Sequence, residues 1–332
     1  MKKKLSIAII GCGRISNKHI EAINNNKFLE LNAVCDIDKN KLDKIDNKIS
    51  KYTNIDLMLL NQRFDLVSIC TPSGVHPEHA IKCIKNKNNV LIEKPLGTNL
   101  NEVKKIFEIN TKYNNQLFIV KQNRFNPTIQ YLKKLISENL LGKIFFIEIN
   151  VIWSRGKDYY TSAEWRGTKK LDGGTLLNQA SHYVDLMFWL FGKPILTQSL
   201  RTKLKADIET EDTFSANLLL ENNIHCSFNA TTTAYEKNIE GSILINCEKG
   251  SIKISGEALN KVNYINSKVK KILELKKYEY QIDNVYGNGH INVYKEIEKK
   301  LNGKTNQALM AKDGLNSLEW ILEQYRKKIY VG

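Results

Sequence analysis

Short apolar runs alternate with amphipathic stretches along residues 5–120. The runs typical of buried strands are Leu5–Ile10, Leu29–Val34, Leu66–Cys70, Val90–Ile92 and Leu117–Val120. The stretches between them that show helical periodicity are Arg14–Asn25, Glu78–Lys85 and Asn101–Tyr113. Apolar strands that alternate with helices are typical of a parallel, doubly wound sheet, so the pattern predicts an α/β domain over residues 1–121.

The pattern changes after residue 121, where longer segments of alternating polarity replace the short runs. Asn126-Pro127 predicts a helix start, with Asn as the capping residue and Pro at the first helical position. The predicted strands are Phe145–Trp153, Thr213–Leu220, His225–Thr232, Ser242–Cys247 and Ser251–Ser255. The predicted helices are Thr175–Phe191, Val293–Leu301 and Ala308–Lys328. Short polar turns between strands favour antiparallel pairing, which predicts an α+β domain over residues 122–332 with a large, mostly antiparallel open sheet. An uncovered apolar face on that sheet would require a partner subunit.

Composition excludes several classes of protein. The 332 residues carry a net charge of +15, but the lysines are spread along the chain rather than gathered in a basic arm. We therefore expect solvated lysine-rich helix faces and no nucleic-acid partner, with capture of an anionic small molecule as the alternative. Six scattered cysteines form no C-x-x-C pair, so neither a metal site nor a disulfide framework is expected. No apolar run is long enough to span a bilayer, and we expect a cytoplasmic protein without a membrane partner.

A glycine turn follows the first predicted strand. Gly11-Cys12-Gly13-Arg14-Ile15-Ser16 leads from that strand into a helix, an arrangement that places a pyrophosphate at a helix N-terminus. Asp36 ends the second strand, where an acidic residue binds the ribose hydroxyls. A carboxylate at this position repels the 2′-phosphate of NADP, so the pattern predicts NAD as the cofactor. The alternative is a structural strand-turn-helix.

Two further motifs lie at predicted strand ends, the edge at which doubly wound sheets bind ligands. Thr71-Pro72 follows the Leu66–Cys70 strand, and Glu93-Lys94-Pro95 follows Val90–Ile92. A lysine at the end of a buried strand is costly unless it faces a wet or functional cleft. Lys94 is therefore a catalytic candidate, and a surface lysine before a proline turn is the alternative.

A third polar motif follows a double glycine. Asp172-Gly173-Gly174 precedes Asn178, His182 and Asp185, whose spacing predicts one shared face of a helix. A histidine in a helix often has only a structural role. The clustering of polar residues beside the glycines makes a catalytic role for His182 an equal alternative.

Together these motifs resemble the glucose–fructose oxidoreductase/inositol dehydrogenase (Gfo/Idh/MocA) family over nearly the whole chain. The resemblance implies an N-terminal Rossmann domain, NAD(P)-dependent oxidation of a sugar or cyclitol, and a dimer or tetramer assembled through the open sheet face. It also implies that Lys94 and His182 are the catalytic pair. Many relatives have Asp four residues before that histidine, where this chain has Asn178. The departure assigns the general-base role to His182 or Lys94, and the choice between them stays open. The cofactor-binding residues that the motifs and the resemblance imply are Gly11, Cys12, Gly13, Arg14, Ile15, Asp36, Thr71, Pro72, His76, Glu93, Lys94, Gln122, Asn123, Trp165 and Arg166.

Within the family, four segments resemble the branch of UDP-N-acetyl-2-amino-2-deoxyglucuronate 3-dehydrogenases. These segments are Lys121–Pro127, Trp153–Arg155, Trp165–Thr168 and Leu176–Gln179. The representative reaction is oxidation of UDP-N-acetylglucosaminuronate at C3, which precedes transamination for surface-glycan biosynthesis, including lipopolysaccharide. A basic segment after Trp153 suits such a substrate, because arginine binds phosphate and carboxylate groups bidentately. Its alternative is an exposed basic loop. The predicted substrate-binding residues are Lys94, Arg155, Tyr159, Tyr160, Asn178, Gln179, His182 and His290.

Other functions stay open from the sequence. A dehydrogenase for a free sugar or inositol, or an NAD-dependent glycosidase, would have the same fold and the same catalytic pair. A catalytically inactive, NAD-sensing regulatory protein is a third alternative, against which the intact Lys94 and His182 argue.

Overall fold

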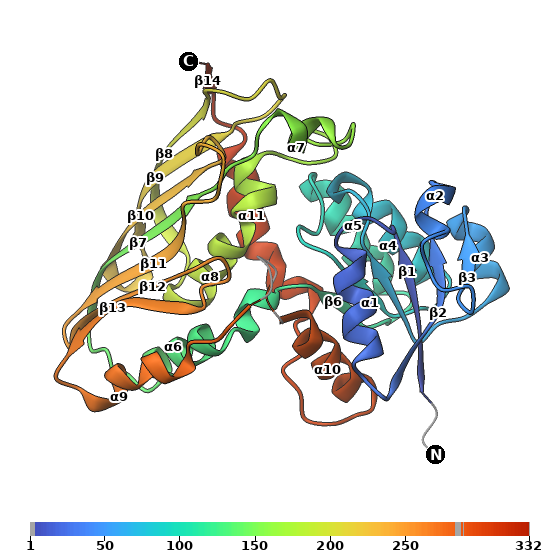
Figure 1. Cartoon of the computed structure of the whole chain (residues 1–332), viewed down its shortest axis with the longest axis horizontal. Coiled ribbons are helices and arrows are strands. Elements are labelled where there is room, and N and C mark those ends of the chain that lie inside the picture. Colours follow the sequence, from blue (N-terminus) through green and yellow to red (C-terminus); the bar gives the residue numbers. More distant parts are fainter. Residues whose placement is uncertain (1–3, 283–286, 288, 332) are drawn as a thin grey trace. The chain divides into compact units, whose positions relative to one another are not determined.

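The computed structural model describes residues 4–282, 287 and 289–331 of the chain (Figure 1). Backbone contacts divide the chain into two compact units, one of Met1–Lys121 with His290–Glu319 and one of Gln122–Gly289 with Trp320–Gly332. The sequence prediction placed all of 122–332 in the second domain, whereas 290–319 belongs with the first unit. The reason is a buried contact, since the Tyr294 hydroxyl lies 2.7 Å from Ser68 Oγ in the interior of the first unit.

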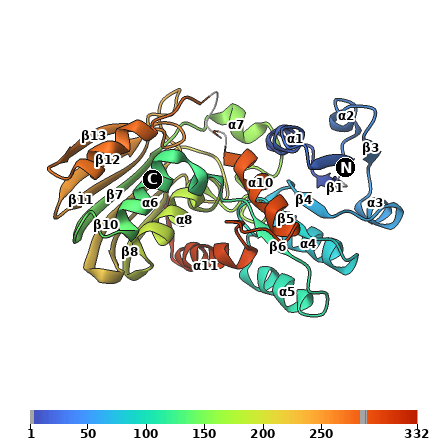
Figure 2. The same cartoon turned by 90° about the horizontal axis from the view of Figure 1, so that it is seen from below.

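The first unit is built on a parallel sheet of six strands in the order β3-β2-β1-β4-β5-β6, which is the Rossmann order. The strands are β1 (Leu5–Ile10), β2 (Leu29–Cys35), β3 (Ser50–Tyr52), β4 (Leu66–Ile69), β5 (Val90–Ile92) and β6 (Leu117–Ile119). The helices are α1 (Ser16–Asn24), α2 (Lys39–Leu42), α3 (Ile55–Asn61), α4 (His76–Lys85), α5 (Leu100–Asn110) and α10 (Gly289–Leu301). In Figure 2, α1 and α10 lie on one side of this sheet and α4 and α5 on the other. The predicted doubly wound sheet is therefore confirmed.

The second unit contains an eight-stranded sheet in the order β13-β12-β11-β7-β10-β9-β8-β14. Its strands are β7 (Ile144–Ile152), β8 (Pro194–Lys203), β9 (Thr213–Leu220), β10 (Ile224–Thr231), β11 (Glu240–Cys247), β12 (Gly250–Ser255), β13 (Lys261–Ser267) and β14 (Ile329–Val331). Two pairs, β7 with β10 and β8 with β14, are parallel, and the other neighbours are antiparallel. The predicted mostly antiparallel sheet is confirmed. Sequence patterning missed β8 and β13 because much of their length is exposed, which weakens the hydrophobic signal.

One face of this sheet is buried against helices and the other is not. The inward residues of β7, among them Ile147 and Ile149, are fully buried, and Trp320 packs edge-on against Phe214 and Phe228. Figure 1 shows α6 (Pro127–Ser137) and α8 (Ser181–Phe191) on this side and no described helix on the other.

The uncovered face is more polar than the sequence pattern predicted. Across its central strands, Asn229 Nδ2 donates to Asn150 Oδ1 at 3.1 Å, and Asn150 Nδ2 donates to Glu148 Oε1 at 2.7 Å. Exposed apolar side chains, such as Leu196 and Leu200, lie on β8 near an edge of the sheet. The expectation of an apolar outer face is therefore wrong for the centre of the sheet.

Two local predictions in the second unit are also wrong. Asn126 precedes α6, but its side chain donates to the Ala258 carbonyl at 2.6 Å instead of capping the helix. The predicted helix over 175–191 is broken at Ala180. A π-helical turn, η3 (Thr175–Gln179), precedes α8, and the Ala180 N–H donates to the Thr175 carbonyl five residues back.

Within the described ranges, no helix combines the length and apolar character that crossing a bilayer requires.

Candidate functional site

The turn after β1 has the backbone geometry of a phosphate cradle. Gly11 adopts φ +94°, and a Cβ there would lie 2.8 Å from backbone atoms of Cys70 and Thr71, so only glycine fits. A Cβ on Gly13 would meet no protein atom within 4 Å, which leaves space beside the turn for a ligand. Ser16 replaces the third glycine of the fingerprint, and its hydroxyl donates to the Gly13 carbonyl at 2.6 Å. The residues present therefore fit a dinucleotide pyrophosphate.

The acidic residue predicted to bind ribose lies beside this turn. The Cys12 N–H donates to Asp36 Oδ2 at 2.7 Å, and the Asp38 N–H donates to Asp36 Oδ1 at 2.9 Å. These bonds orient the carboxylate and leave each oxygen a lone pair for a ribose hydroxyl. Lys41 Nζ lies 3.6 Å from Oδ1, which partly balances the charge.

Ile37 is a candidate that the sequence analysis missed. It follows Asp36 directly, and 90% of it is exposed, although most residues of its type are buried. An exposed apolar side chain beside the ribose carboxylate offers a surface for the adenine ring. Its sequence signal is the isoleucine that directly follows the acid at a strand end.

His76 joins the turns that follow β4 and β5. Its Nε2 lies 2.7 Å from the Thr71 carbonyl and its Nδ1 lies 2.7 Å from the Pro95 carbonyl, and the side chain is buried. Two carbonyls accept together only from the imidazolium form. Burial opposes that form and lowers the pKa of His76, although both carbonyls act to raise it. Both ring nitrogens hold the turns at Thr71 and Pro95, and the cofactor contact of His76 stays a prediction.

Lys94 begins the turn after β5, and Glu93 beneath it belongs to a buried cluster. His19 Nε2 lies 2.9 Å and His290 Nε2 lies 3.3 Å from Glu93 Oε1, and the Lys94 N–H donates to Glu93 Oε2 at 3.0 Å. His290 is only 2% exposed. His290 supports the Lys94 turn from inside the first unit, and its contact with substrate stays a prediction. Glu93 supports the same turn, and its contact with the cofactor also stays a prediction.

The donor atoms of His19, Glu93 and His290 lie within 4.8 Å of one another, a grouping with the composition of a metal site. Both imidazoles already point an Nε2 at the same carboxylate oxygen, and each would have to release that contact to bind a metal. The cluster is therefore described as a hydrogen-bond network.

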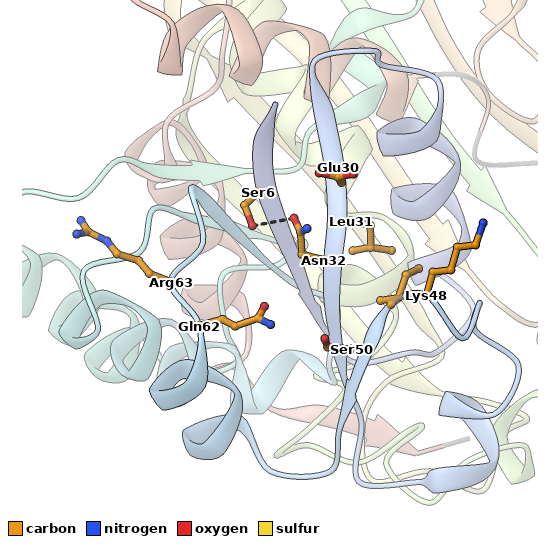
Figure 3. Close-up of a pocket in the computed structure, with 9 residues that line it drawn as sticks. Ser6, Glu30, Leu31, Asn32, Lys48, Ser50, Gln62 and Arg63 are labelled. Carbon is orange, nitrogen blue, oxygen red and sulfur yellow. Dashed lines mark hydrogen bonds between the residues drawn. The ribbon is translucent and has the colours of Figure 1, made fainter. Parts of the chain in front are cut away.

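A hollow of about 520 Å³ in the first unit lies away from these groups (Figure 3). Ser6, Glu30 and Ser50 line it, and they stand at or near the starts of β1, β2 and β3. The Ser6 hydroxyl donates to Asn32 Oδ1 at 2.8 Å within it. Gly11 and Asp36 follow the opposite ends of β1 and β2, so this hollow is not the dinucleotide site.

In the second unit, His182 lies in the first turn of α8 and contacts the segment that follows β6. Gln122 Nε2 lies 3.1 Å from His182 Nε2, and Gln122 is part of the short helix η2 (Gln122–Phe125). Arg124, from the same short helix, forms a two-pronged ion pair with Asp185 at 2.7 and 2.8 Å. This buried pair fixes η2 against α8 and so holds Gln122 beside the histidine. Gln122 therefore orients His182. The sequence analysis predicts a cofactor contact for Gln122 but not this second role. Asn123, another predicted cofactor residue, is also buried in η2.

Asn178 lies in the π-helical turn and not in the α-helix that contains His182 and Asp185. It lies in η3, and its side chain donates to Asp172, which also accepts the Gly167 N–H at 2.6 Å. Gly174, with φ +93°, begins this turn, and a Cβ there would meet the Glu211 carboxylate. Glu211 in turn accepts the Leu176 N–H at 3.0 Å. The double glycine therefore permits the close approach of buried carboxylates to the π-helical turn.

A cluster of arginine and aromatic side chains lies in the same unit. The ring of Tyr159, in α7 (Lys157–Thr161), has the Arg166 guanidinium 4.2 Å and the Arg155 guanidinium 5.1 Å from its centroid. Arg155 Nε donates to Gln179 Oε1 at 3.1 Å, and Gln179 Nε2 donates to the Tyr159 hydroxyl at 2.8 Å. Burial raises the pKa of Tyr159, which Arg166 opposes, so the phenol stays protonated at neutral pH. Four predicted site residues are thus brought together.

Trp165 and Tyr160 border this cluster. The Arg166 guanidinium lies 4.6 Å from the Trp165 ring centroid, and the Tyr160 hydroxyl is 3.2 Å from Thr232 Oγ1. A second hollow, of about 390 Å³, is lined by Trp153 and Asn238, and Asn238 Oδ1 accepts from Arg155 Nη1 at 3.1 Å. The arginine cluster therefore adjoins space that a ligand can enter.

Buried polar atoms without a hydrogen-bond partner also occur in the second unit. Gln122 Oε1, Arg166 Nε and Ser181 Oγ are buried and find no hydrogen-bond partner among the described residues. Moreover, neither Arg155 nor Arg166 forms an ion pair with a carboxylate in the described part of the chain. Buried polar atoms are nearly always satisfied, so these atoms are suited to a polar ligand, and the Arg166 donor suits an anionic group.

Comparison with known proteins agrees with this geometry. Residues 5–121 match the family described as "Oxidoreductase family, NAD-binding Rossmann fold", and residues 129–253 match the "GFO/IDH/MocA C-terminal domain". The WlbA dehydrogenase from Bordetella pertussis, solved in complex with NADH and UDP-GlcNAcA, is 34% identical, with TM-score 0.93 over 98% of this chain and 96% of that chain. The WlbA enzyme from Chromobacterium violaceum, solved with the same two ligands, is 35% identical, with TM-score 0.91 over 98% and 94% of the two chains. Glucose-6-phosphate 3-dehydrogenase from Bacillus subtilis is 27% identical over 64% of this chain and 60% of that protein.

Proposed function

Because the chain belongs to the Gfo/Idh/MocA family of NAD-dependent oxidoreductases, we propose that it oxidises the C3 hydroxyl of UDP-N-acetylglucosaminuronate. The product would be a 3-keto sugar, which suits transamination in surface-glycan biosynthesis. The two WlbA dehydrogenases, solved with NADH and UDP-GlcNAcA, support this substrate.

The observation that carries the proposal is the pair of arginines, Arg155 and Arg166, that contact the ring of Tyr159. Their guanidinium groups have no carboxylate partner among residues 4–282, 287 and 289–331, and each lies against the Tyr159 ring. A UDP-linked sugar acid has a diphosphate and a carboxylate that arginine forks bind bidentately, and a uracil or sugar ring that an aromatic side chain can stack against. A free sugar or inositol has no anion for either arginine.

Lys94 and His182 are the proposed catalytic side chains. Bound NAD supplies the acceptor for the hydrogen that leaves the sugar carbon with its electron pair. The hydroxyl proton must go to a base, and neutral His182 is suited to accept it because imidazole titrates near neutral pH. Lys94 is suited to hydrogen-bond the same oxygen and stabilise the negative charge that grows on it.

Gln122 restricts how His182 can act. A carboxamide N–H that donates to His182 Nε2 occupies the lone pair of that nitrogen, so a neutral ring then has its proton on Nδ1. A flipped carboxamide would instead accept from Nε2–H. In either orientation Gln122 fixes the ring plane, and its other amide atom is buried and available to a ligand.

We also propose that a second copy of the chain covers the outer face of the eight-stranded sheet. Exposed Leu196 and Leu200 lie on this face, and the Asn150–Asn229 hydrogen-bonded pair offers polar groups that a partner can match. Light scattering of the purified protein should then give the mass of a dimer or tetramer. A monomer at micromolar concentration would contradict this part of the proposal.

The substrate is tested by incubating the protein with NAD and a panel of UDP-sugars, free sugars and inositols while reduced nicotinamide is followed by absorbance. We expect turnover with UDP-N-acetylglucosaminuronate and much weaker turnover with neutral UDP-sugars. A keto-acid acceptor belongs in a parallel reaction, because tightly held NADH would otherwise hide turnover. Preference for a free sugar or inositol would contradict the proposed substrate and favour the simpler dehydrogenase. Binding of NAD without turnover of any sugar would favour an NAD-sensing role.

A further inference from the structure

The geometry points to Glu93 as a positioning residue whose buried carboxylate, held by His19 and His290, fixes the turn of Lys94 and stabilises its ammonium form. This inference rests on the proposed catalytic role of Lys94. It adds a function for two histidines, from α1 and α10, that the proposed reaction leaves unexplained.

The hydrogen bonds around Glu93 have only one self-consistent direction when the carboxylate is ionised. A carboxylate only accepts, so His19 must donate from Nε2, and a neutral ring then accepts at Nδ1. The Tyr294 hydroxyl, 2.8 Å from His19 Nδ1, supplies that proton, and Ser68 Oγ, 2.7 Å away, donates to Tyr294. In this hydrogen-bonded series, His19, Tyr294 and Ser68 then each donate one hydrogen bond to the next group.

Titration behaviour agrees with these assignments. Burial alone would raise the pKa of Glu93, but the hydrogen bonds from His19 and His290 outweigh it and hold that pKa well below its usual range. Burial lowers the pKa of His19, so its ring is neutral at neutral pH. Glu93 is therefore ionised and His19 is neutral in the interior of the first unit.

The ionised Glu93 also contacts the backbone of the residue that follows it. Glu93 Oε2 accepts the N–H of Lys94, so the carboxylate fixes the residue that carries the proposed catalytic amine. A nearby carboxylate favours the ammonium form of lysine and raises its pKa. The other ionisable groups that face Glu93 are His19, His76, His290, Tyr294 and Cys70.

His290 ties this cluster to a distant part of the sequence. It lies 197 residues after Glu93 and donates from Nε2, and its Nδ1 is buried without a partner among the described residues. Because an ionised carboxylate only accepts, the contact with Glu93 requires a proton on Nε2 of this ring. The C-terminal segment therefore contributes to the shape of the Lys94 turn.

The test measures the apparent pKa of Lys94 itself. The purified protein is acetylated competitively across a pH series, and the Lys94 peptide is quantified by mass spectrometry against the peptide of exposed Lys112. Glu93→Gln should lower the apparent pKa of Lys94 by about one unit or more. The matched control is Glu78→Gln, which removes an exposed carboxylate from α4 in the same unit and should leave the Lys94 pKa unchanged. An equal pKa in wild type and Glu93→Gln would overturn the inference.

A second pair of variants serves where Glu93→Gln does not fold. Leu cannot donate at position 290, whereas Gln can, so His290→Leu should lower kcat about tenfold or more and His290→Gln should restore most of it. The KM for substrate and the affinity for NAD should change less than about threefold in both, whereas a merely structural defect would lower stability and binding together. Equal kcat values for the two His290 variants would overturn the inference, as would a stoichiometric metal in the purified protein. If Lys94→Ala retained full turnover, the proposed function would fail instead, whatever pKa is measured for Lys94 in the wild type.

Discussion

Gln122 Nε2 lies 3.1 Å from His182 Nε2, and this contact joins the segment that follows the Rossmann sheet to the helix that carries the proposed base. The Arg124–Asp185 ion pair, one turn further along, holds the same two elements together. The orientation of His182 therefore depends on η2, a short helix for whose residues no catalytic step is proposed.

Replacing Gln122 with Glu should make this dependence visible in the pH profile. A carboxylate beside the ring stabilises imidazolium and raises the pKa of His182 by about one unit. A base must be neutral to accept a proton, so the acid limb of kcat should move to higher pH by the same amount. Steady-state kcat measured from pH 5 to 10 checks this, with Gln122→Met as a similar-sized uncharged control that should lower kcat without moving the limb. An unmoved limb in Gln122→Glu would exclude His182 as the titrating base.

Removing either proposed catalytic side chain should abolish turnover without abolishing cofactor binding. Lys94→Ala and His182→Ala should each lower kcat by roughly a thousandfold or more, because each removes a group that acts on the reacting hydroxyl. The affinity for NADH, measured by fluorescence titration, should stay within about threefold of wild type. Near-normal rates in both variants would remove the proposed mechanism.

The two glycines of the β1 turn should respond differently to alanine. Gly11→Ala places a Cβ 2.8 Å from backbone atoms at φ +94°, so the free energy of unfolding should fall by about 2 kcal/mol or more. Gly13→Ala meets no protein atom within 4 Å and should leave stability unchanged while weakening NAD binding. Denaturant titration and NAD titration of both variants separate the two effects. Equal NAD affinity in Gly13→Ala and wild type would place the pyrophosphate elsewhere.

Arg155 should determine affinity for the anionic part of the substrate. Arg155→Ala should raise the KM for the UDP-sugar by about tenfold to a hundredfold, since a lost bidentate contact costs on the order of 1.4–3 kcal/mol. Lys205→Ala, which removes an exposed cation of the same unit, is the control and should leave KM unchanged. A KM that does not respond to Arg155→Ala would instead favour a substrate without phosphate.

The sequence predicted those parts of the site that depend on local backbone geometry. Gly11 and Asp36 follow buried strands, and the order of strand, turn and helix places both at one edge of a parallel sheet. Asn99 depends on local sequence in the same way, since its side chain accepts from the N–H groups of Asn101 and Glu102 at the start of α5.

Features that depend on long-range packing were not predictable in this way. His290 shows no pattern that links it to Glu93, because the contact needs α10 to return to the first unit. The π-helical turn over Thr175–Gln179 was not predictable from the sequence, because its periodicity suits one continuous α-helix. The polar outer face of the sheet was missed because its side chains satisfy one another across strands.

The most direct measurement of the central claim follows the hydrogen that leaves the substrate. UDP-N-acetylglucosaminuronate labelled with deuterium at C3 is incubated with the protein and NAD, and the nicotinamide is analysed by mass spectrometry. The account predicts one deuterium in the reduced nicotinamide, a matching 3-keto sugar, and a slower rate than with unlabelled substrate if the transfer limits turnover. Reduced nicotinamide that carries no deuterium, or no reduction at all with this substrate, would contradict it.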